Sequence, residues 1–264
     1  MIFFKRALCT ISNRSDRLQQ KIIDLFINRI KTVNHRQKKM FFYAPNPLSR
    51  YRIRTFSTKE PDTLAWIDSM PRESIFWDIG ANIGIYSVYA AKARKCKVLA
   101  FEPSVFNLEL LAKNIYLNQM QEKVLIFPIA LSDKSGFNLF RMSNTVWGGA
   151  LSTFGENYNQ NGNFFNSVFE YTTPSMTMDS VVSLTSVEKP NYIKIDVDGI
   201  EHLILAGARN VLKTTQSVLI EIDENFTEQI QLCNQHLLQA GLVLEHKFSL
   251  GVGSNQYNQL WVRR

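Results

Sequence analysis

The sequence predicts an α/β fold, with a seven-stranded, mostly parallel sheet, helices on both faces, a C-terminal antiparallel hairpin and a helical N-terminal extension. The first observation is an apolar run, Ile75–Ile79, joined by a glycine turn to a second run, Ile85–Ala93, which is typical of a buried strand followed by a buried helix. The second is the alternation of strand-like and helix-like segments up to Ala240. The third is a pair of strand-like segments that closes the chain.

The N-terminal part is predicted to be an extension. From Ser15 to Lys39, apolar residues recur at helical spacing with basic residues between them, which indicates a basic amphipathic helix. Its apolar stripe either lies on a membrane surface or packs on the domain or on a second subunit. The run Tyr51–Phe56 is strand-like, and Pro61 favours the first turn of a helix that ends at Met70. We assign residues 1–58 to the extension and residues 59–264 to the domain.

The other expected elements follow in order. Ser104 is a helix N-cap, Gly241 ends the last helix, and residues 143–166 form a long loop. The expected strands cover residues 97–102, 124–127, 137–142, 191–197, 218–222, 243–246 and 257–262, and the remaining helices cover 177–182, 200–212 and 226–240.

Charge and cysteine content bear on compartment and partners. The net charge is +7, yet residues 1–60 contain 14 Lys and Arg against 3 Asp and Glu, so the basic character belongs to the extension. The 3 cysteines have no C-x-x-C spacing, which favours neither a disulfide framework nor a zinc site. We expect a cytoplasmic protein whose residues 1–40 contact the inner membrane surface peripherally, since no apolar run near the start is long enough to span a bilayer.

The glycine turn indicates a nucleotide site. Gly80 allows a sharp turn that leaves the backbone uncovered, and Gly84 lets the helix start close to the sheet. Asp78 would repel a pyrophosphate but suits the cationic S-adenosylmethionine, so NAD is disfavoured. Glu102 ends the next strand, where it can accept bonds from ribose hydroxyls. The alternative is a turn whose glycines serve packing only.

Two further segments are candidate ligand contacts. Ser132 and Asp133 follow the third strand, where they either contact an adenine edge or form a turn with Gly136. The loop at residues 143–166 is rich in Asn, Gly and aromatic residues, and we assign it, with Trp147, to the substrate side. Disorder of this loop is the competing interpretation.

Acidic residues gather after the fourth strand. Lys194, Asp196 and Asp198 alternate, so they point to one face, while Glu201 follows one turn into the next helix and Glu221 ends strand five. Carboxylates grouped in this way require a cation, a metal or a proton-transfer task. A Mg²⁺ ion on Asp196 and Glu221 is one option, and simple neutralisation of Asp196 by Lys194 is another.

These segments together resemble a known family. Asp78–Gly84 (DIGANIG), Phe101-Glu102-Pro103 with Asn107, Ala130–Asp133 (ALSD) and Lys194–Glu201 (KIDVDGIE) look like the FkbM-type S-adenosylmethionine-dependent methyltransferases, over roughly residues 50–225. The resemblance implies a class I, Rossmann-like fold and methyl transfer to a hydroxyl of a sugar, a glycan or a secondary metabolite. It adds Asn107 to the cofactor residues. Asp198 stands where the family more often has Glu, and we place it on the substrate side.

The predicted function is O-methylation. Asp196, Glu201 and Glu221 are the predicted catalytic residues, and a small molecule or glycan is the predicted acceptor. The sequence has neither the Tyr-x-x-x-Lys of short-chain dehydrogenases nor the Asn-Pro-Pro-aromatic motif of base N-methylation, and no nucleic-acid partner is expected. A non-catalytic nucleotide-binding or scaffolding protein of the same fold is the alternative, and the oligomeric state is left open.

Overall fold

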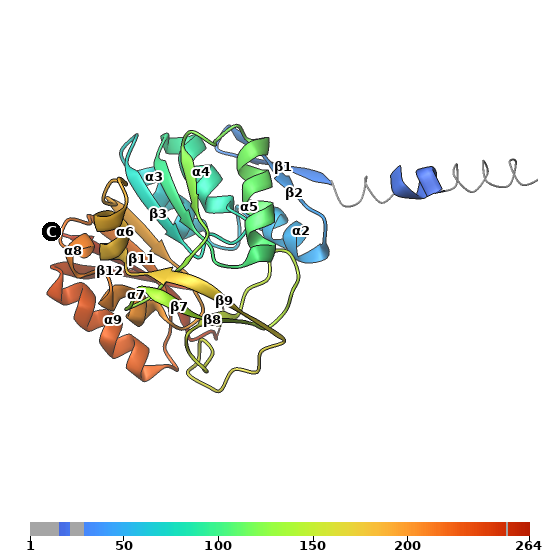
Figure 1. Ribbon diagram of the computed structural model, residues 1–264. Coiled ribbons are helices and arrows are strands. Elements are labelled where there is room, and N and C mark those ends of the chain that lie inside the picture. The colour runs from blue at the N-terminus through green and yellow to red at the C-terminus, as the bar shows by residue number, and fades with distance from the viewer. Residues whose placement is uncertain (1–15, 22–28, 252) are drawn as a thin grey trace, which may run out of the picture.

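The computed structural model describes residues 16–21, 29–251 and 253–264 (Figure 1). Its centre is a seven-stranded sheet in the order β12-β13-β11-β10-β3-β4-β5. The strands β5, β4, β3, β10 and β11 are parallel, and β13 and β12 add an antiparallel edge. This order confirms the predicted parallel sheet with a C-terminal hairpin. The strands are β3 (Ile75–Ile79), β4 (Lys97–Phe101), β5 (Val124–Phe127), β10 (Tyr192–Ile195), β11 (Ser217–Asp223), β12 (Leu242–Ser249) and β13 (Gln256–Arg263).

Helices cover both faces of this sheet, as the sequence predicts. Phe76 of β3 packs into the core with the helices α3, α4 and α5, whereas its neighbour Trp77 packs into the core with α6 to α9. Successive strand residues point to opposite faces, so a continuous apolar strand supplies two cores. These helices are α3 (Pro61–Ser69), α4 (Ile85–Arg94), α5 (Val105–Leu117), α6 (Met178–Leu184), α7 (Glu201–Ala206), α8 (Arg209–Leu212) and α9 (Thr227–Gln239).

The helix predicted as one unit over residues 200–212 is two helices. The break lies at Gly207, where a Cβ atom would approach the backbone oxygen of Ser132 to 2.4 Å. The chain therefore passes closely over the segment after β5, and a glycine is required at this crossing.

The helix predicted from Ser15 to Lys39 is wrong for its second half. Residues 16–21 are helical, and residues 22–28 lie outside the described part of the chain. Ile30–His35 (β1) and Lys38–Tyr43 (β2) form an antiparallel hairpin instead. Both turn residues, Arg36 and Gln37, have positive φ angles, 44° and 64°, as tight hairpin turns require. In β2 the buried residues alternate with less buried ones. This period of two is typical of a strand, and the prediction of a helix did not take it into account.

The strand predicted over Tyr51–Phe56 is also wrong, because Pro47–Arg54 is a helix, α2. Asn46 caps it by accepting a bond from the Ser49 N–H, and the Ser49 hydroxyl returns a contact to the Asn46 N–H. Pro47 occupies the first helical position, where its missing N–H costs nothing. The Asn-Pro pair was a helix-start signal in the sequence.

Two buried asparagines bond the hairpin to the rest of the chain. Asn114 lies in α5, and Asn118 is the residue directly after α5. Asn114 accepts a bond from the Tyr43 N–H at 2.8 Å and donates one to the Ile83 carbonyl at 2.8 Å. Asn118 accepts from the Phe41 N–H at 3.0 Å. Met40 and Phe42 are fully buried in the same core as α3, α4 and α5. Residues 30–58 are thus packed against the sheet and its helices.

A second sheet carries the long loop of residues 143–168. It has four strands in the order β6-β9-β7-β8, which are β6 (Ala130–Leu131), β7 (Gly136–Met142), β8 (Ser152–Phe154) and β9 (Phe169–Met176). The sequence predicts β7 but not β8 or β9. Among residues 16–21, 29–251 and 253–264, no helix has the length and apolarity needed to cross a membrane.

We expect Asn114→Ala to lower the free energy of unfolding by ~2–4 kcal/mol, because it leaves the buried Tyr43 N–H and Ile83 carbonyl without partners. Chemical denaturation measures the change. Asn166→Ala, at an exposed position, is the matched control and should change stability little. Equal stabilities for the two variants would contradict this account of how the hairpin is attached.

Candidate functional site

A cavity of about 240 Å³ opens at the carboxyl ends of β3, β4, β10 and β11, and we call it the sheet-end cavity. Open α/β sheets bind ligands at this edge. The residues that line it are Arg52, Lys59, Gly80, Asn82, Glu102, Pro103, Ser104, Asn107, Phe140, Gly149, Ala150, Leu151, Ser152, Gln160, Asp196, Val197, Asp198, Glu221 and Gln256.

The glycine turn after β3 forms one wall. Gly80 has a φ of 82°, and a Cβ atom there would lie 1.9 Å from the Asp196 carbonyl oxygen. Gly84 has a φ of 78°, and a Cβ atom there would lie 2.4 Å from the Leu111 side chain of α5. Both positions therefore require glycine, and the turn runs close to β10 with its backbone open to the cavity.

Glu102 lines the cavity at the end of β4. Its carboxylate accepts bonds from the N–H groups of Asn82 and Ser104, both at 2.8 Å. Burial raises the pKa of Glu102 to about 7, and these backbone N–H groups oppose the rise. Each carboxylate oxygen has a second lone pair, so the group can still accept a bond from a ligand hydroxyl.

Asp78 lies beneath the turn instead of facing the cavity. It is 1 % exposed and accepts a 2.5 Å bond from the Ser87 hydroxyl. Burial raises its pKa, while the charge of Lys194, its register partner on β10, opposes that rise. The structure therefore places Asp78 in the support of the turn.

The loop after β7 is held over the cavity by three side chains. Asn107 accepts from the Gly148 N–H at 2.9 Å and donates to the Gly149 carbonyl at 3.1 Å, and Asn82 donates to the same carbonyl at 2.7 Å. Arg52 donates from Nε to the Gly148 carbonyl at 2.8 Å. The two predicted cofactor residues Asn82 and Asn107 thus position the loop.

Trp147 is directed elsewhere. Its indole N–H donates to Glu109 of α5 at 3.0 Å, while the cavity is lined by the next residues along the loop, Gly149–Ser152. Trp147, which the sequence predicts on the substrate side, is therefore not among the residues that line the cavity, whereas Gly149–Ser152 are.

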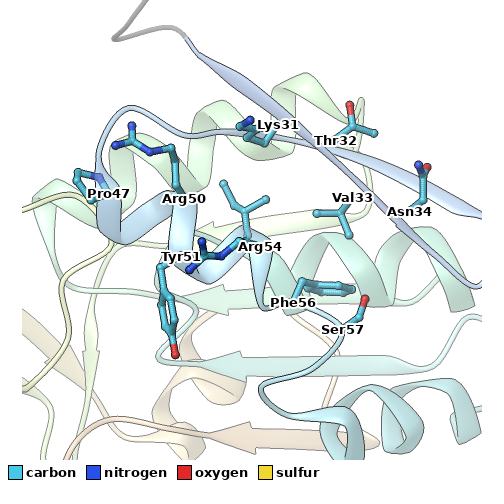
Figure 2. Close-up of a pocket in the computed structure, with 11 residues that line it drawn as sticks. Lys31, Thr32, Val33, Asn34, Pro47, Arg50, Tyr51, Arg54, Phe56 and Ser57 are labelled. Carbon is cyan, nitrogen blue, oxygen red and sulfur yellow. The ribbon is translucent and has the colours of Figure 1, made fainter.

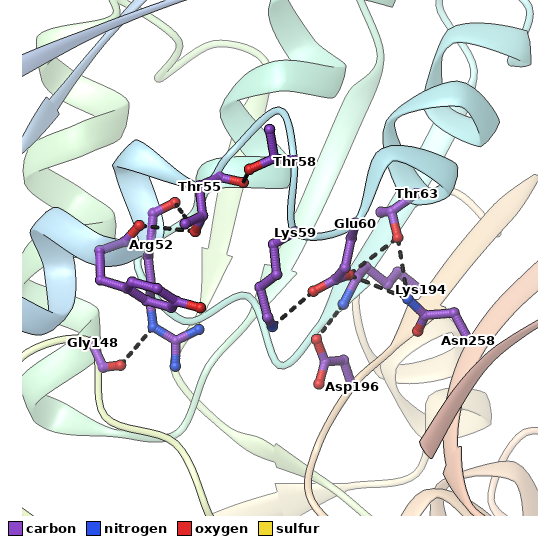
Figure 3. A network of polar contacts seen from close by, with 11 residues as sticks. Arg52, Thr55, Thr58, Lys59, Glu60, Thr63, Gly148, Lys194, Asp196 and Asn258 are labelled. Carbon is purple, nitrogen blue, oxygen red and sulfur yellow. Dashed lines mark hydrogen bonds and ion pairs between the residues drawn. The ribbon is translucent and has the colours of Figure 1, made fainter. Parts of the chain in front are cut away.

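A buried lysine holds Asp196, one of two cavity-lining acids that lie at the carboxyl ends of β10 and β11 (Figure 3). Lys194 is 2 % exposed, and its ammonium lies 2.5 Å from Asp196. Burial raises the pKa of Asp196, but the ammonium of Lys194 outweighs this and holds it below its usual value. Asp196 is therefore ionised at neutral pH.

Glu221, at the carboxyl end of β11, is the second acid at the cavity. Burial and then the negative charge of Asp196 raise its pKa well above the usual value. In the described part of the chain its carboxyl has no hydrogen-bond partner. The pair thus combines one carboxyl whose pKa is lowered, that of Asp196, with one whose pKa is raised, that of Glu221.

Asp198 also lines the cavity but is engaged by the loop. It accepts bonds from the N–H groups of Leu151 at 2.7 Å and Ser152 at 3.3 Å. Burial raises its pKa to about 6, and the charge of Asp196 adds to the rise. This side chain connects the turn after β10 to the loop.

Besides Asp78, Gly84 and Trp147, three more predicted site residues do not line the cavity: Glu201, Ser132 and Asp133. Glu201 is 2 % exposed and accepts bonds from the Gly199 N–H at 3.0 Å and from the side chain of Gln229. Ser132 donates its hydroxyl to Asp133 at 3.1 Å beside β9. Glu201 therefore braces the turn after β10, and Ser132 and Asp133 form part of the second sheet's edge.

Three residues of the site were missed at the sequence level: Arg52, Lys59 and Glu60. Lys59 lies 2.9 Å from Glu60, whose other oxygen accepts bonds from Thr63 and Asn258 at 3.1 and 3.3 Å (Figure 3). Burial raises the pKa of Glu60, but the charges of Lys194 and Lys59 hold it below the usual value. The only sequence signal was the run Thr58–Pro61 before α3.

Among the residues that the structure describes, no group of three or more His, Cys, Asp or Glu side chains could hold a metal ion. Asp196 is bonded to an ammonium, which competes for the same oxygens.

The chain is similar to known methyltransferases. A family model described as the methyltransferase FkbM domain matches residues 78–250, which include the glycine turn, the loop and both acids. The chain belongs to the FkbM methyltransferase family. A hexuronic acid methyltransferase, AglP, from Haloferax volcanii is 27% identical over 174 residues, which cover 65% of each chain. The methyltransferase sdnD of Sordaria araneosa is 35% identical over 71 residues, which cover 26% of this chain and 27% of that one.

Solved structures show the same fold. The methyltransferase FkbM of Methylobacillus flagellatus matches with a TM-score of 0.50 at 14% identity, over 73% of this FkbM-family chain and 44% of that one. A putative transferase of Pyrococcus horikoshii matches with a TM-score of 0.50 at 11% identity, over 90% and 73%. This family member therefore spans 65% of the Haloferax relative and less than half of the Methylobacillus chain. The class I, Rossmann-like fold is confirmed.

The raised pKa of Glu201 predicts how stability depends on pH. Burial raises this pKa from 4.5 to about 8, so between these values the folded state holds a proton that the unfolded chain has released. Its contribution to stability is present at low pH and is lost as the pH rises through 8. When the pH is raised from 6 to 8.5, the unfolding free energy of the wild type should therefore fall by about 2 kcal/mol more than that of Glu201→Gln. Urea titrations at both pH values measure the two decreases. Equal decreases would contradict the raised pKa of Glu201.

Proposed function

We propose that the protein is an S-adenosylmethionine-dependent methyltransferase that methylates a hydroxyl of a sugar, a glycan or a secondary metabolite. One observation carries the proposal: the sheet-end cavity joins the glycine turn and Glu102 to the Asp196 and Glu221 pair. Membership of the FkbM family supports it. S-adenosylmethionine supplies a methyl group that is already activated on a sulfonium.

The turn side of the cavity fits the cofactor. Gly80 keeps the backbone uncovered where any Cβ would clash with Asp196, and Asn82 lies beside it. Glu102 would accept bonds from ribose hydroxyls, and the acidic lining suits a ligand that carries a sulfonium and an ammonium. The cations Arg52 and Lys59 would bind the carboxylate of its methionine part. Both line the sheet-end cavity and also a small cavity of about 40 Å³ that Gly80 lines as well.

Asp196 of the acid pair would receive the hydroxyl proton. An alcohol is a poor nucleophile while protonated, and a carboxylate placed beside it can take the proton as the oxygen–methyl bond forms. Lys194 keeps Asp196 ionised and therefore able to accept a hydrogen bond from the hydroxyl. The main contribution of the residues is alignment of the acceptor oxygen with the methyl group, and the loop at Gly149–Ser152 narrows the space in which it can lie.

The name of one relative supports a sugar acceptor. The Haloferax volcanii relative is called a hexuronic acid methyltransferase. We propose a hydroxyl of a sugar unit as the first acceptor to test. A hexuronic acid glycoside and the matching neutral hexoside distinguish an acidic acceptor from a neutral one.

Glu102→Ala should weaken binding of S-adenosylmethionine roughly tenfold or more, because a charge-assisted bond to a ribose hydroxyl contributes ~1.5–3 kcal/mol. Calorimetry measures the affinity. Glu122→Ala, at an exposed position, is the control and should bind as the wild type does. If Glu102→Ala also keeps wild-type affinity, the cofactor site is assigned wrongly.

Asp196→Asn should lower turnover by ~10²–10⁴-fold with cofactor affinity near that of the wild type, because it removes the proton acceptor and leaves the glycine turn intact. Release of S-adenosylhomocysteine in the presence of the acceptor measures turnover, and Glu122→Gln is the control. Wild-type turnover in Asp196→Asn would show that the acid pair is structural. Binding of the cofactor without turnover of any acceptor would instead favour a non-catalytic nucleotide-binding protein.

The same assay separates the two ways of removing the proton. Direct transfer to Asp196 should continue when EDTA is present. If activity falls with EDTA and returns with Mg²⁺, an ion on Asp196 and Glu221 is the means of acidifying the hydroxyl.

A further inference from the structure

A second and larger cavity, of about 710 Å³, lies between β1 and α2, and we call it the basic cavity (Figure 2). β1 supplies Lys31 and Val33 to it, and α2 supplies Arg50, Ile53 and Arg54 from the opposite side. A cavity of this volume is in the range of small-molecule sites. The proposed methyl transfer makes no use of it.

The basic cavity is lined by cationic side chains and by no acidic side chain of the described residues. The cationic side chains are those of Lys31, Arg50 and Arg54. In the described part of the chain, none of these three cations forms an ion pair. Like charges held around one space repel each other, and a bound anion relieves that repulsion. Arg50 is half-buried and Arg54 exposed, so both guanidinium groups are accessible to a ligand.

The floor of the basic cavity is apolar. Val33, Ile53 and Phe56 are 8 %, 4 % and 2 % exposed and belong to the main core. A guanidinium rim matches the oxygens of a phosphate, and an apolar floor matches a hydrocarbon chain. The combination fits an anionic amphiphile better than a free anion, which would leave the apolar floor unused.

The position of the basic cavity agrees with such a ligand. Its strand β1 directly follows residues 1–29, in which basic residues outnumber acidic ones. Phe56 lines both the basic cavity and the small cavity that contains Arg52 and Asp196. A lipid bound here would therefore hold the methyl-transfer site close to a membrane surface.

We propose that the basic cavity binds the phosphate group of a lipid, with Arg50 and Arg54 on the phosphate and the apolar floor against the start of the hydrocarbon chain. This goes beyond the proposed methyl transfer and does not rest on it. The two are tested separately, because the readout here is binding of a phosphate amphiphile and not turnover.

The direct test is calorimetric titration of the full chain with hexyl phosphate. The wild type should bind it, and the double variant Arg50→Gln/Arg54→Gln should bind it at least about tenfold more weakly, since both removed cations contact the phosphate. The control Arg72→Gln/Lys189→Gln removes the same charge at exposed positions outside the cavity and should bind as the wild type does. A thermal melt verifies that each variant is folded.

Two further arms identify the source of the phosphate. Inorganic phosphate should bind much more weakly than hexyl phosphate, and equal affinity would overturn the assignment to a lipid. With phosphatidylcholine vesicles that contain about a quarter phosphatidic acid, sedimentation of the wild type and the control should exceed that of Arg50→Gln/Arg54→Gln. No binding of hexyl phosphate by the wild type, or equal binding by both double variants, would overturn the proposal.

Discussion

The structure depends on a lysine buried in the middle of its central sheet. Lys194 lies on β10 opposite Asp78 of β3, its ammonium is 2.5 Å from Asp196, and it lies 5.1 Å from the centre of the Tyr86 ring of α4. The charges of Asp196, Glu60 and Asp78 together raise the pKa of Lys194 although burial opposes them. A buried cation is tolerated only among such partners, and loss of one partner leaves an uncompensated charge. The ammonium of Lys194 thereby holds four elements together: the strands β3 and β10, the start of α3 and the helix α4.

The shape of the sheet-end cavity follows from this arrangement. Lys194 holds the Asp196 side chain at the end of β10, and the Asp196 N–H donates to the Ile79 carbonyl of β3 at 3.1 Å. The Asp196 backbone therefore lies so close to Gly80 that the turn after β3 has room only for a glycine. The loop after β7 is attached by two backbone carbonyls, those of Gly148 and Gly149, which accept bonds from Arg52 of α2, Asn82 of the turn and Asn107 of α5. Both attachment points favour glycine: Gly148 has a φ of 80°, and a Cβ atom at Gly149 would lie 2.4 Å from the Asn144 side chain.

The N-terminal segment belongs to the site as much as to the fold. The hairpin β1–β2 is attached to α5 through Asn114, and α2 follows it directly, which brings Arg52 over the loop and Lys59 over the acids. Removing residues 30–59 would therefore expose the core and take two cations, Arg52 and Lys59, from the sheet-end cavity. The basic side chains of the first 60 residues line at least two separate cavities, the sheet-end cavity and the basic cavity.

Local patterns in the sequence determined the central fold and the proposed cofactor side of the site. The turn Asp78–Gly84 joins directly to one apolar strand, and Glu102 directly follows the next. Their placement therefore follows from short-range backbone constraints and from the rule that parallel strands end at one edge of the sheet. The hairpin and α2 were mistaken for a helix and a strand because short segments with mixed periods are decided by what they pack against, here α5 and β1. Only the tertiary structure decided that Glu201 braces a turn, that Trp147 faces α5, and that Arg52 and Lys59 reach the acids. Those outcomes depend on contacts between residues far apart in sequence, and the spacing of residues along the chain carries no information about them.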